Sequence, residues 1–142
     1  QKEWFLVSAT FQLKPISAEE SSFARGRSVE IKRHRHKRYP HTHTCGSFFK
    51  NFSPEEVKDT SKKLIYVAYY LDKLGLKGEL AFGDAIISHQ HANMIINRGN
   101  ATTTDILNLT LDMQRRVQET FGITPQPECQ LIGFSKNPFI EK

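Results

Sequence analysis

The chain of 142 residues has the usual size of one domain, so a complete enzyme with separate cofactor and substrate domains hardly fits. With 38% hydrophobic and 25% charged residues it has the composition of a folded globular domain, which excludes the disordered and collagen-like classes. Its net charge of +5 comes from one segment, because residues 25–38 carry seven basic residues and one acidic residue. The rest of the chain, with 13 basic and 14 acidic residues, is nearly neutral. This imbalance indicates a focused anion site or a basic tail rather than a generally basic surface.

The sequence also bears on the compartment. No apolar run approaches the roughly 20 residues that cross a bilayer, and the N-terminus lacks the basic, apolar and small-residue order of a secretory signal. Cys45 and Cys129 lie far apart in a chain without an extracellular signature. We therefore expect two free thiols in a reducing compartment rather than a disulfide.

The N-terminal part predicts a strand and a connecting helix. Residues 4–13 alternate as in a strand that is apolar on much of both faces, and Pro15 closes it. Ser17 and Glu20 form a capping-box pattern for a helix over about residues 17–36. Because apolar positions are sparse in this helix, it is predicted to be a connector, with a domain boundary within it or just after it.

The middle of the chain predicts one long helix and two strands. Residues 39–52 are rich in His, Thr and Gly and are expected to be irregular. Ser53 as N-cap, a proline after it and an apolar stripe at helical spacing predict a long helix that ends at Gly75. Two short strands are expected next, at residues 80–88 and 92–97.

The C-terminal part predicts a second helix and a last strand. The helix begins at a cap formed by Thr103 or Thr104 and ends at Phe121, with Gly122 as the C-terminal cap. Residues 127–134 are predicted to be a strand. The whole pattern indicates an α+β fold in which a small mixed sheet packs against two long helices.

Within the basic segment, Arg35 and Lys37 are candidates for phosphate binding, because guanidinium and ammonium groups make charge-assisted hydrogen bonds to phosphate oxygens. An isolated run of charge is more often a solvated helix face. Nucleic-acid binding needs basic residues interleaved with aromatic ones, and only Tyr39 lies close by. A diphosphate therefore fits the segment better than a nucleic acid does.

The histidines raise the question of a metal site. His41, His43 and Cys45 alternate, which on an extended segment places three potential ligands on one face. No CxxC or HxxxH pair completes a tetrahedral site. Histidines that are exposed, or satisfied within the core, therefore fit the pattern better than zinc ligands do.

Two polar residues are candidates for catalysis. Ser47 lies between a glycine and two phenylalanines, outside any nucleophile-elbow pattern. Its hydroxyl could donate a proton, but only to a strongly basic centre such as a carbanion. Glu128 lies in an otherwise apolar predicted strand, where it either faces water or, if it points inward, serves a functional site.

Five blocks of the chain, spread over residues 40–134, resemble one known family. They are Cys45-Gly46-Ser47-Phe48-Phe49-Lys50-Asn51, Gly75-Leu76-Lys77-Gly78, Ser88-His89-Gln90-His91-Ala92-Asn93-Met94-Ile95-Ile96-Asn97 with Gly99-Asn100-Ala101-Thr102, Phe121-Gly122-Ile123, and residues 128–133. Together they look like the C-terminal domain of the UDP-N-acetylenolpyruvoylglucosamine reductase family (UDP-N-acetylmuramate dehydrogenase, MurB). The strand predicted at residues 4–13 resembles the last strand of that family's flavin-binding portion.

The resemblance implies a bacterial, cytoplasmic flavoenzyme of peptidoglycan synthesis, and hence a part in cell-wall biogenesis, cell shape and cell division. In this family NADPH reduces FAD, and the flavin passes a hydride to the enolpyruvyl ether of UDP-N-acetylglucosamine, which becomes the lactyl ether of UDP-N-acetylmuramic acid. The implied partner is this UDP-sugar, with no nucleic acid and no membrane. The complete enzyme is expected to be a monomer.

The resemblance also implies roles for single residues. Ser47 matches the family's proton donor, and Glu128 matches an active-site glutamate that is expected to polarise the enolpyruvyl group. Asn51 and His91 match substrate-contacting positions. Lys37 resembles the basic residue that reaches the diphosphate, a role for which the charge pattern also makes Arg35 a candidate. No metal is implied.

Nothing in the chain resembles the family's glycine-rich FAD-binding segments. We therefore expect residues 1–15 to be the end of a flavin-binding domain, residues 16–38 a linking helix and residues 39–142 the substrate-binding domain, and we expect this chain alone to be inactive. The rival hypothesis is a non-enzymatic module that binds RNA or another polyanion through residues 25–43.

Overall fold

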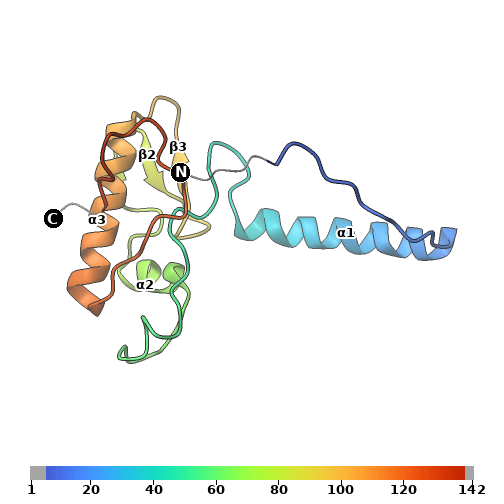
Figure 1. Ribbon diagram of the computed structural model, residues 1–142, viewed down its shortest axis with the longest axis horizontal. Coiled ribbons are helices and arrows are strands. Elements are labelled where there is room, and N and C mark those ends of the chain that lie inside the picture. Colours follow the sequence, from blue (N-terminus) through green and yellow to red (C-terminus); the bar gives the residue numbers. More distant parts are fainter. Residues whose placement is uncertain (1–5, 140–142) are drawn as a thin grey trace. The chain divides into compact units, whose positions relative to one another are not determined.

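The structure is a computed structural model in which residues 6–139 are described (Figure 1). The chain divides into two compact units, Gln1–His34 and Arg35–Lys142. The elements in chain order are α1 (Ala18–Arg38), α2 (Val67–Lys73), β1 (Ala81–Phe82), β2 (Ala85–Ile87), β3 (Ile95–Asn97) and α3 (Thr103–Phe121). The predicted α+β class is confirmed, but the sheet is antiparallel, in the order β1-β2-β3, rather than mixed.

The helix predicted over residues 17–36 is present as α1. The Ser17 hydroxyl accepts a hydrogen bond from the Glu20 backbone N–H at 3.1 Å, and the Glu20 carboxylate accepts one from the Ser17 N–H at 2.8 Å. This capping box satisfies two of the backbone donors at the start of the helix. Since α1 has no buried residue, its own backbone and cap hold it, without packing in a core.

The strand predicted at residues 4–13 is not formed in its described part. Residues 6–13 belong to no strand, and their large apolar side chains are 79–92% exposed. Positions 4 and 5 lie outside the described residues. An alternating pattern forms a strand only where a neighbouring strand supplies hydrogen bonds, and no segment within the described residues pairs with this one.

The long helix predicted from Ser53 is wrong, because only its C-terminal end, α2, is helical. The capping box at its start does form, since the Glu56 carboxylate accepts a hydrogen bond from the Ser53 N–H at 2.7 Å. The Thr60 hydroxyl then donates to the Val57 carbonyl at 2.7 Å and accepts from the Lys63 N–H at 3.1 Å. A side chain that satisfies backbone groups locally competes with helical hydrogen bonds, and residues 53–66 form turns and irregular backbone instead of a helix.

The segment predicted as one strand at residues 80–88 forms two short strands, β1 and β2, which pair as a hairpin. Phe82 of β1 pairs with Ala85 of β2, which leaves a two-residue turn at Gly83 and Asp84. Gly83 has a φ of +52°, and a Cβ added there would lie 2.6 Å from the Asp105 side chain. Only glycine fits this turn, for its backbone conformation and for its lack of a side chain.

Both ends of α3 are capped, the N-terminus by side-chain hydrogen bonds and the C-terminus by a glycine in the left-handed conformation. Its N-cap is Thr102, rather than the predicted Thr103 or Thr104, and Asp105 completes a capping box with it. Gly122, with a φ of +72°, is the C-cap as predicted, and its N–H donates to the Gln118 carbonyl at 2.9 Å. The strand predicted after this helix, at residues 127–134, is absent apart from one isolated bridge.

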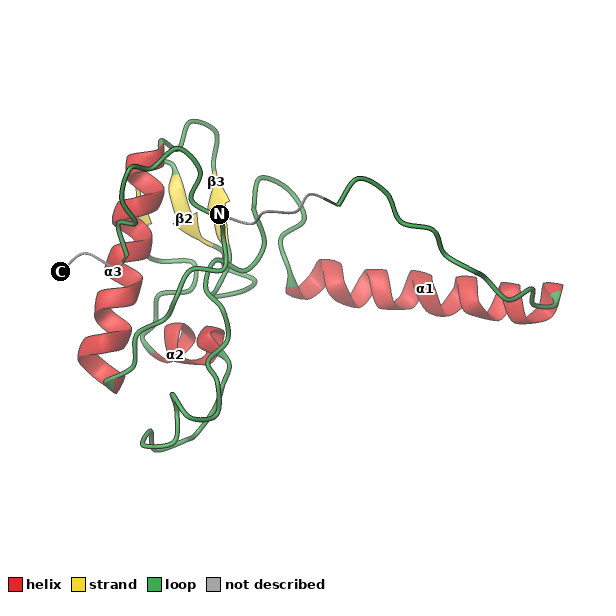
Figure 2. Cartoon of the chain, viewed as in Figure 1, coloured by secondary structure: helices red, strands yellow, loops and turns green. Residues whose placement is uncertain are grey.

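The core lies in the second unit, where α3 runs along the sheet and also contacts α2 (Figure 1). The buried face of α3 includes Leu109, Met113 and Val117, each 0% exposed. Loops make up most of the chain between α1 and α2 and after α3 (Figure 2). One of these loops contributes Phe49, at 0% exposed, and Phe52, at 5%, to the core. The loop that contains Ser47 is therefore anchored by aromatic packing.

Candidate active site

The loop that contains Ser47 lies beside two other segments of the chain. Ser47 itself forms an antiparallel bridge with Met94. On the other side, the backbone N–H of Glu128 donates to the Phe48 carbonyl at 2.8 Å. These backbone contacts bring Ser47 and Glu128 together although they are far apart in the sequence.

Asn93 fixes the same loop from inside the core. It is 2% exposed, its side-chain oxygen accepts from the Phe49 N–H at 3.0 Å, and its side-chain nitrogen donates to the Phe49 carbonyl at 2.8 Å. Its own carbonyl accepts from the Phe48 N–H at 2.9 Å. Because buried backbone groups need hydrogen-bond partners, Asn93 holds the residues that follow Ser47 in one conformation. Asn93 was not predicted as a site residue, although it is an amide among apolar residues in the third family block.

Ser47 and Glu128 line one shallow depression of about 420 Å³, together with Cys45 and Cys129. We call it the Ser47 depression. Ser47 is half-buried there and Glu128 is exposed. Within residues 6–139 no protein group engages the Ser47 hydroxyl in a hydrogen bond, so its proton is available to a bound molecule. The two predicted catalytic residues thus share a site that could hold a weak acid and a carboxylate beside one ligand.

The two thiols of this depression lie close together. The Sγ atoms of Cys45 and Cys129 are 3.5 Å apart, and both thiols are free, as predicted. Burial raises the pKa of the Cys129 thiol to about 12, with further contributions from the hydrogen bond and charge of Cys45 and from the charge of Glu128. The sequence did not predict this closeness, because the two cysteines are far apart in the chain and only the pairing of their segments in the fold brings the thiols together.

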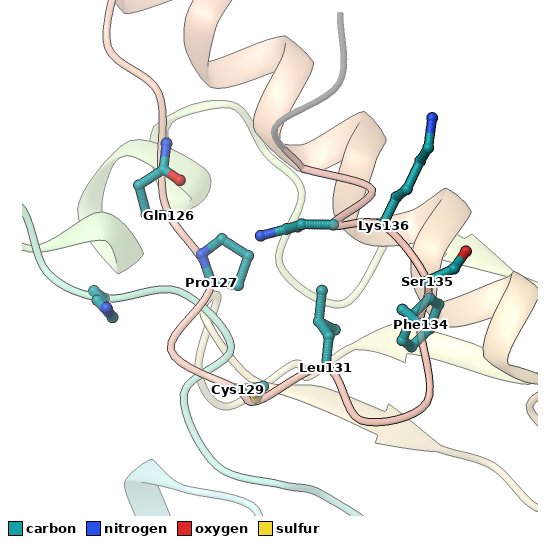
Figure 3. Close-up of a pocket in the computed structure, with 9 residues that line it drawn as sticks. Gln126, Pro127, Cys129, Leu131, Phe134, Ser135 and Lys136 are labelled. Carbon is teal, nitrogen blue, oxygen red and sulfur yellow. The ribbon is translucent and has the colours of Figure 1, made fainter. Parts of the chain in front are cut away.

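A second depression, of about 460 Å³, shares Cys129 with the first (Figure 3). We call it the loop depression. Figure 3 shows the labelled side chains, from Gln126 to Lys136, arranged along the curved C-terminal loop. Lys50 also lines it. Asn51, predicted to contact the substrate, is exposed and follows Lys50 directly.

His91 lies apart from these two depressions. It lines a smaller one, of about 210 Å³, with Lys77 and five further residues. Its Nδ1 accepts from the Asn93 N–H at 3.3 Å, and its ring centre is 5.0 Å from that of Tyr39. Burial lowers the pKa of His91, and the charges of Arg38 and Lys77 lower it further, so the neutral imidazole is favoured near neutral pH.

The end of α1 contributes the other cations near His91. The Gln90 side-chain nitrogen donates to the His36 carbonyl at 2.8 Å, and the guanidinium groups of Arg35 and Arg38 lie 5.5 and 5.7 Å from the Tyr39 ring centre. We call this the basic region. It consists of Arg35, Lys37, Arg38, Tyr39, Lys77 and His91. Arg35 and Lys37, predicted to bind the diphosphate, are both exposed in it.

The structure therefore groups the predicted site residues into separate places. Ser47 and Glu128 share the Ser47 depression, whereas Arg35, Lys37 and His91 belong to the basic region. Lys77 also lies in the basic region. It was not predicted as a site residue, although it belongs to the second family block. Its ammonium group also pairs with Asp72 at 3.0 Å.

The described residues give no support to the zinc hypothesis. Across residues 6–139 no cluster of three or more His, Cys, Asp and Glu side chains has a geometry that could hold a metal ion. The His41 ring instead stacks on the His36 ring, with centres 4.9 Å apart.

No helix among residues 6–139 is both long and apolar enough to span a membrane.

Comparison with known proteins defines the class of this domain. Residues 37–132 match the family model of the UDP-N-acetylenolpyruvoylglucosamine reductase C-terminal domain. Two relatives named UDP-N-acetylenolpyruvoylglucosamine reductase are similar to it. The protein from Gloeobacter violaceus is 36% identical over 96% of this chain, and that from Desulfosudis oleivorans is 46% identical over 63%.

A solved structure agrees with the sequence matches. The UDP-N-acetylenolpyruvylglucosamine reductase of Thermus caldophilus superposes on 77% of this chain with a TM-score of 0.52 and 34% identity. The chain belongs to the UDP-N-acetylenolpyruvoylglucosamine reductase family and contains its C-terminal domain. It spans 26–42% of the length of the two relatives and 35% of the solved chain.

Proposed function

We propose that this chain is the substrate-binding part of a bacterial, cytoplasmic enzyme that reduces UDP-N-acetylglucosamine enolpyruvate to UDP-N-acetylmuramate in peptidoglycan synthesis. The observation that carries the proposal is the Ser47 depression, where the two residues that match the family's catalytic positions lie together. Family membership supports the same reaction. We further propose that the complete enzyme is a monomer.

Ser47 is proposed to supply the proton of the reduction. Adding a hydride to the terminal vinyl carbon leaves a carbanion or enolate at the carbon next to the carboxylate, and this centre must gain one proton. A serine hydroxyl is a weak acid, but it can protonate so strong a base when it is held close to it. Glu128 is proposed to polarise the enolpyruvyl group and to hold the enolic intermediate.

The basic region is proposed to bind the diphosphate of the UDP-sugar. Lys37 and Arg35 are exposed cations there, with Arg38 and Lys77 nearby. Charge-assisted hydrogen bonds to phosphate oxygens are among the stronger ones in proteins, and two or three suffice for a diphosphate. His91 and Asn51 are proposed to contact other parts of the substrate.

FAD and NADPH are the proposed cofactors of the complete enzyme, but the described residues do not fit an FAD site. Free N–H groups at a helix N-terminus commonly bind the diphosphate of a dinucleotide. At the starts of α1 and α3 two of the backbone donors already bond within capping boxes, and α2 has only seven residues. We therefore propose that FAD binds elsewhere in the complete enzyme and that this chain alone is inactive.

The proposed arrangement of the chain follows from this. Residues 1–15 are proposed to be the end of a flavin-binding domain, residues 16–38 a linking helix and residues 39–142 the substrate-binding domain.

Few observations support the rival hypothesis of a polyanion-binding module. Arg35 and Arg38 lie near one aromatic ring, that of Tyr39, and no row of stacking rings accompanies them in the described residues.

Ser47→Ala in the complete enzyme tests the proposal. Reduction of the flavin by NADPH should persist, whereas its reoxidation by the UDP-sugar should slow about 10³-fold, because only the second step needs the proton. Stopped-flow absorbance of the flavin measures both steps. Ser61→Ala, at an exposed serine of the same unit, is the matched control. Reoxidation at the normal rate in Ser47→Ala would remove Ser47 from its role as the acid.

A further inference from the structure

Cys45 and Cys129 have the placement of a redox-active pair. Their Sγ atoms are 3.5 Å apart, and a disulfide needs about 2.05 Å, so the two atoms must approach by about 1.5 Å. Both residues are in loops, outside every helix and strand, where the chain can accommodate such a movement. They are also the only two cysteines in the sequence, so no third thiol competes for either of them.

The backbone around the two cysteines keeps them facing each other. The Glu128 N–H bonds to the Phe48 carbonyl at 2.8 Å, and the Cys129 thiol lies 3.9 Å from the Ser47 carbonyl oxygen. Gly46, with a φ of +91°, turns the chain between Cys45 and Ser47. The pairing of the two segments therefore brings the two cysteines to the same place in the fold.

We propose that Cys45 and Cys129 form a reversible disulfide that regulates the Ser47 depression. The proposed regulation of the Ser47 depression rests on the proposed function, whereas the proposed formation of the disulfide does not. The disulfide would join the residue next to Glu128 to a residue two positions before Ser47. All four residues line the depression, so the bond draws its two walls together and restricts access for the substrate.

The reaction proceeds by thiol–disulfide exchange with a low-molecular-weight disulfide such as glutathione disulfide. The exposed Cys45, as thiolate, attacks one sulfur of the oxidant and releases one glutathione thiolate. Cys129 then loses its proton to solvent and attacks the Cys45 sulfur, which releases the second glutathione. Two protein thiols are oxidised and one glutathione disulfide is reduced, so atoms and electrons balance.

The order of attack follows from the environments of the two thiols. Cys129 is half-buried, and its pKa is raised to about 12, so it is a poor first nucleophile. As the second nucleophile it acts within the molecule, where its closeness to Cys45 compensates for its small thiolate fraction. Cys129→Ser should therefore accumulate a glutathione adduct on Cys45, whereas Cys45→Ser should react slowly.

Intact mass after incubation with glutathione disulfide tests the disulfide itself. The protein should lose two hydrogens, become resistant to thiol alkylation and unfold at a temperature higher by about 5 °C, and dithiothreitol should reverse all three changes. The double variant Cys45→Ser/Cys129→Ser is the control and should not respond. A product that stops at glutathione adducts, or retains two alkylatable thiols, overturns the proposal.

Flavin reoxidation by the UDP-sugar in the complete enzyme tests the regulation. The oxidised protein should be about 10-fold to 100-fold slower than the reduced protein, because small displacements at a reacting centre have effects of this size. An unchanged rate, with the disulfide established by mass, overturns the regulatory role. If even the reduced enzyme with an intact Ser47 is inactive, the proposed function fails and the mass result still decides whether the disulfide forms.

Discussion

The Ser47 depression and the basic region are built in different ways. The first is made by backbone pairing of three segments and by the buried amide of Asn93. The second is made by side chains near the surface, of which Arg35, Arg38 and His91 lie around the Tyr39 ring, and Gln90 ties it to the end of α1. A proton transfer needs atoms held in a fixed geometry, whereas attraction of an anion needs only charges of the right sign nearby, since it falls off slowly with distance.

The largest expected effect tests the rigid half of this comparison. In Asn93→Ala the buried N–H and carbonyl of Phe49 lose their partners, which should lower the free energy of unfolding by about 2–4 kcal/mol. Urea unfolding followed by circular dichroism measures it. Asn108→Ala, on the exposed face of α3, should change stability by less than about 0.5 kcal/mol. Equal stabilities for the two variants would contradict the role given to Asn93.

An intermediate effect tests the charged half. Lys37→Ala should weaken binding of UDP about 10-fold, which corresponds to about 1.5 kcal/mol for a hydrogen bond between charged groups, without changing the unfolding temperature. Isothermal titration calorimetry at two salt concentrations measures it, and the difference should shrink at high salt. Lys62→Ala, at another exposed lysine, is the control. If both lysine variants bind UDP equally well, the proposed diphosphate site is wrong.

The smallest expected effect lies within the basic region, at His91. Its pKa is lowered in the folded protein by burial first and by Arg38 and Lys77 next, so as pH falls the unfolded chain takes up the proton first. The contribution of His91 to stability is therefore present above a pH of about 6.5 and is lost as pH falls below it.

Thermal unfolding at pH 7.5 and pH 5.5 measures this contribution. The wild type should lose about 1–3 °C more than His91→Gln between these pH values. The capping carboxylates Glu20 and Asp105 do not interfere, because their hydrogen bonds lower their pKa values and they titrate at lower pH. His89→Gln, at an exposed neighbour, should behave as the wild type. Identical pH dependence in His91→Gln would show that burial and the two cations do not lower the pKa of this ring.

Local signals predicted part of the fold well. The capping box at Ser17 and the glycine cap at Gly122 gave the start of α1 and the end of α3, because a cap depends on residues within one turn. The helix expected from Ser53 failed for a reason equally local, the hydrogen bonds of the Thr60 hydroxyl. Its apolar stripe fitted a helix, but periodicity does not report such competition.

The candidate site shows the same limit. The family blocks selected Ser47 and Glu128, and the structure places them in one depression. Asn93, Lys77 and the closeness of the two thiols were missed, since each depends on which segments meet across the fold. The strand predicted at residues 4–13 did not form over its described residues, 6–13, because a strand needs a partner that its own pattern cannot supply.

By itself, the sequence determined the family, the α+β class, the helix caps at Ser17 and Gly122 and the identity of the candidate catalytic residues, all of which depend on residue type and local spacing. Only the tertiary structure decided that Ser47, Glu128, Cys45 and Cys129 share one depression and that the predicted phosphate-binding cations Arg35 and Lys37 lie outside it, beside Tyr39 and Gln90. The physical reason is that contacts between distant segments are set by strand pairing, buried hydrogen bonds and core packing, which act on the folded chain as a whole.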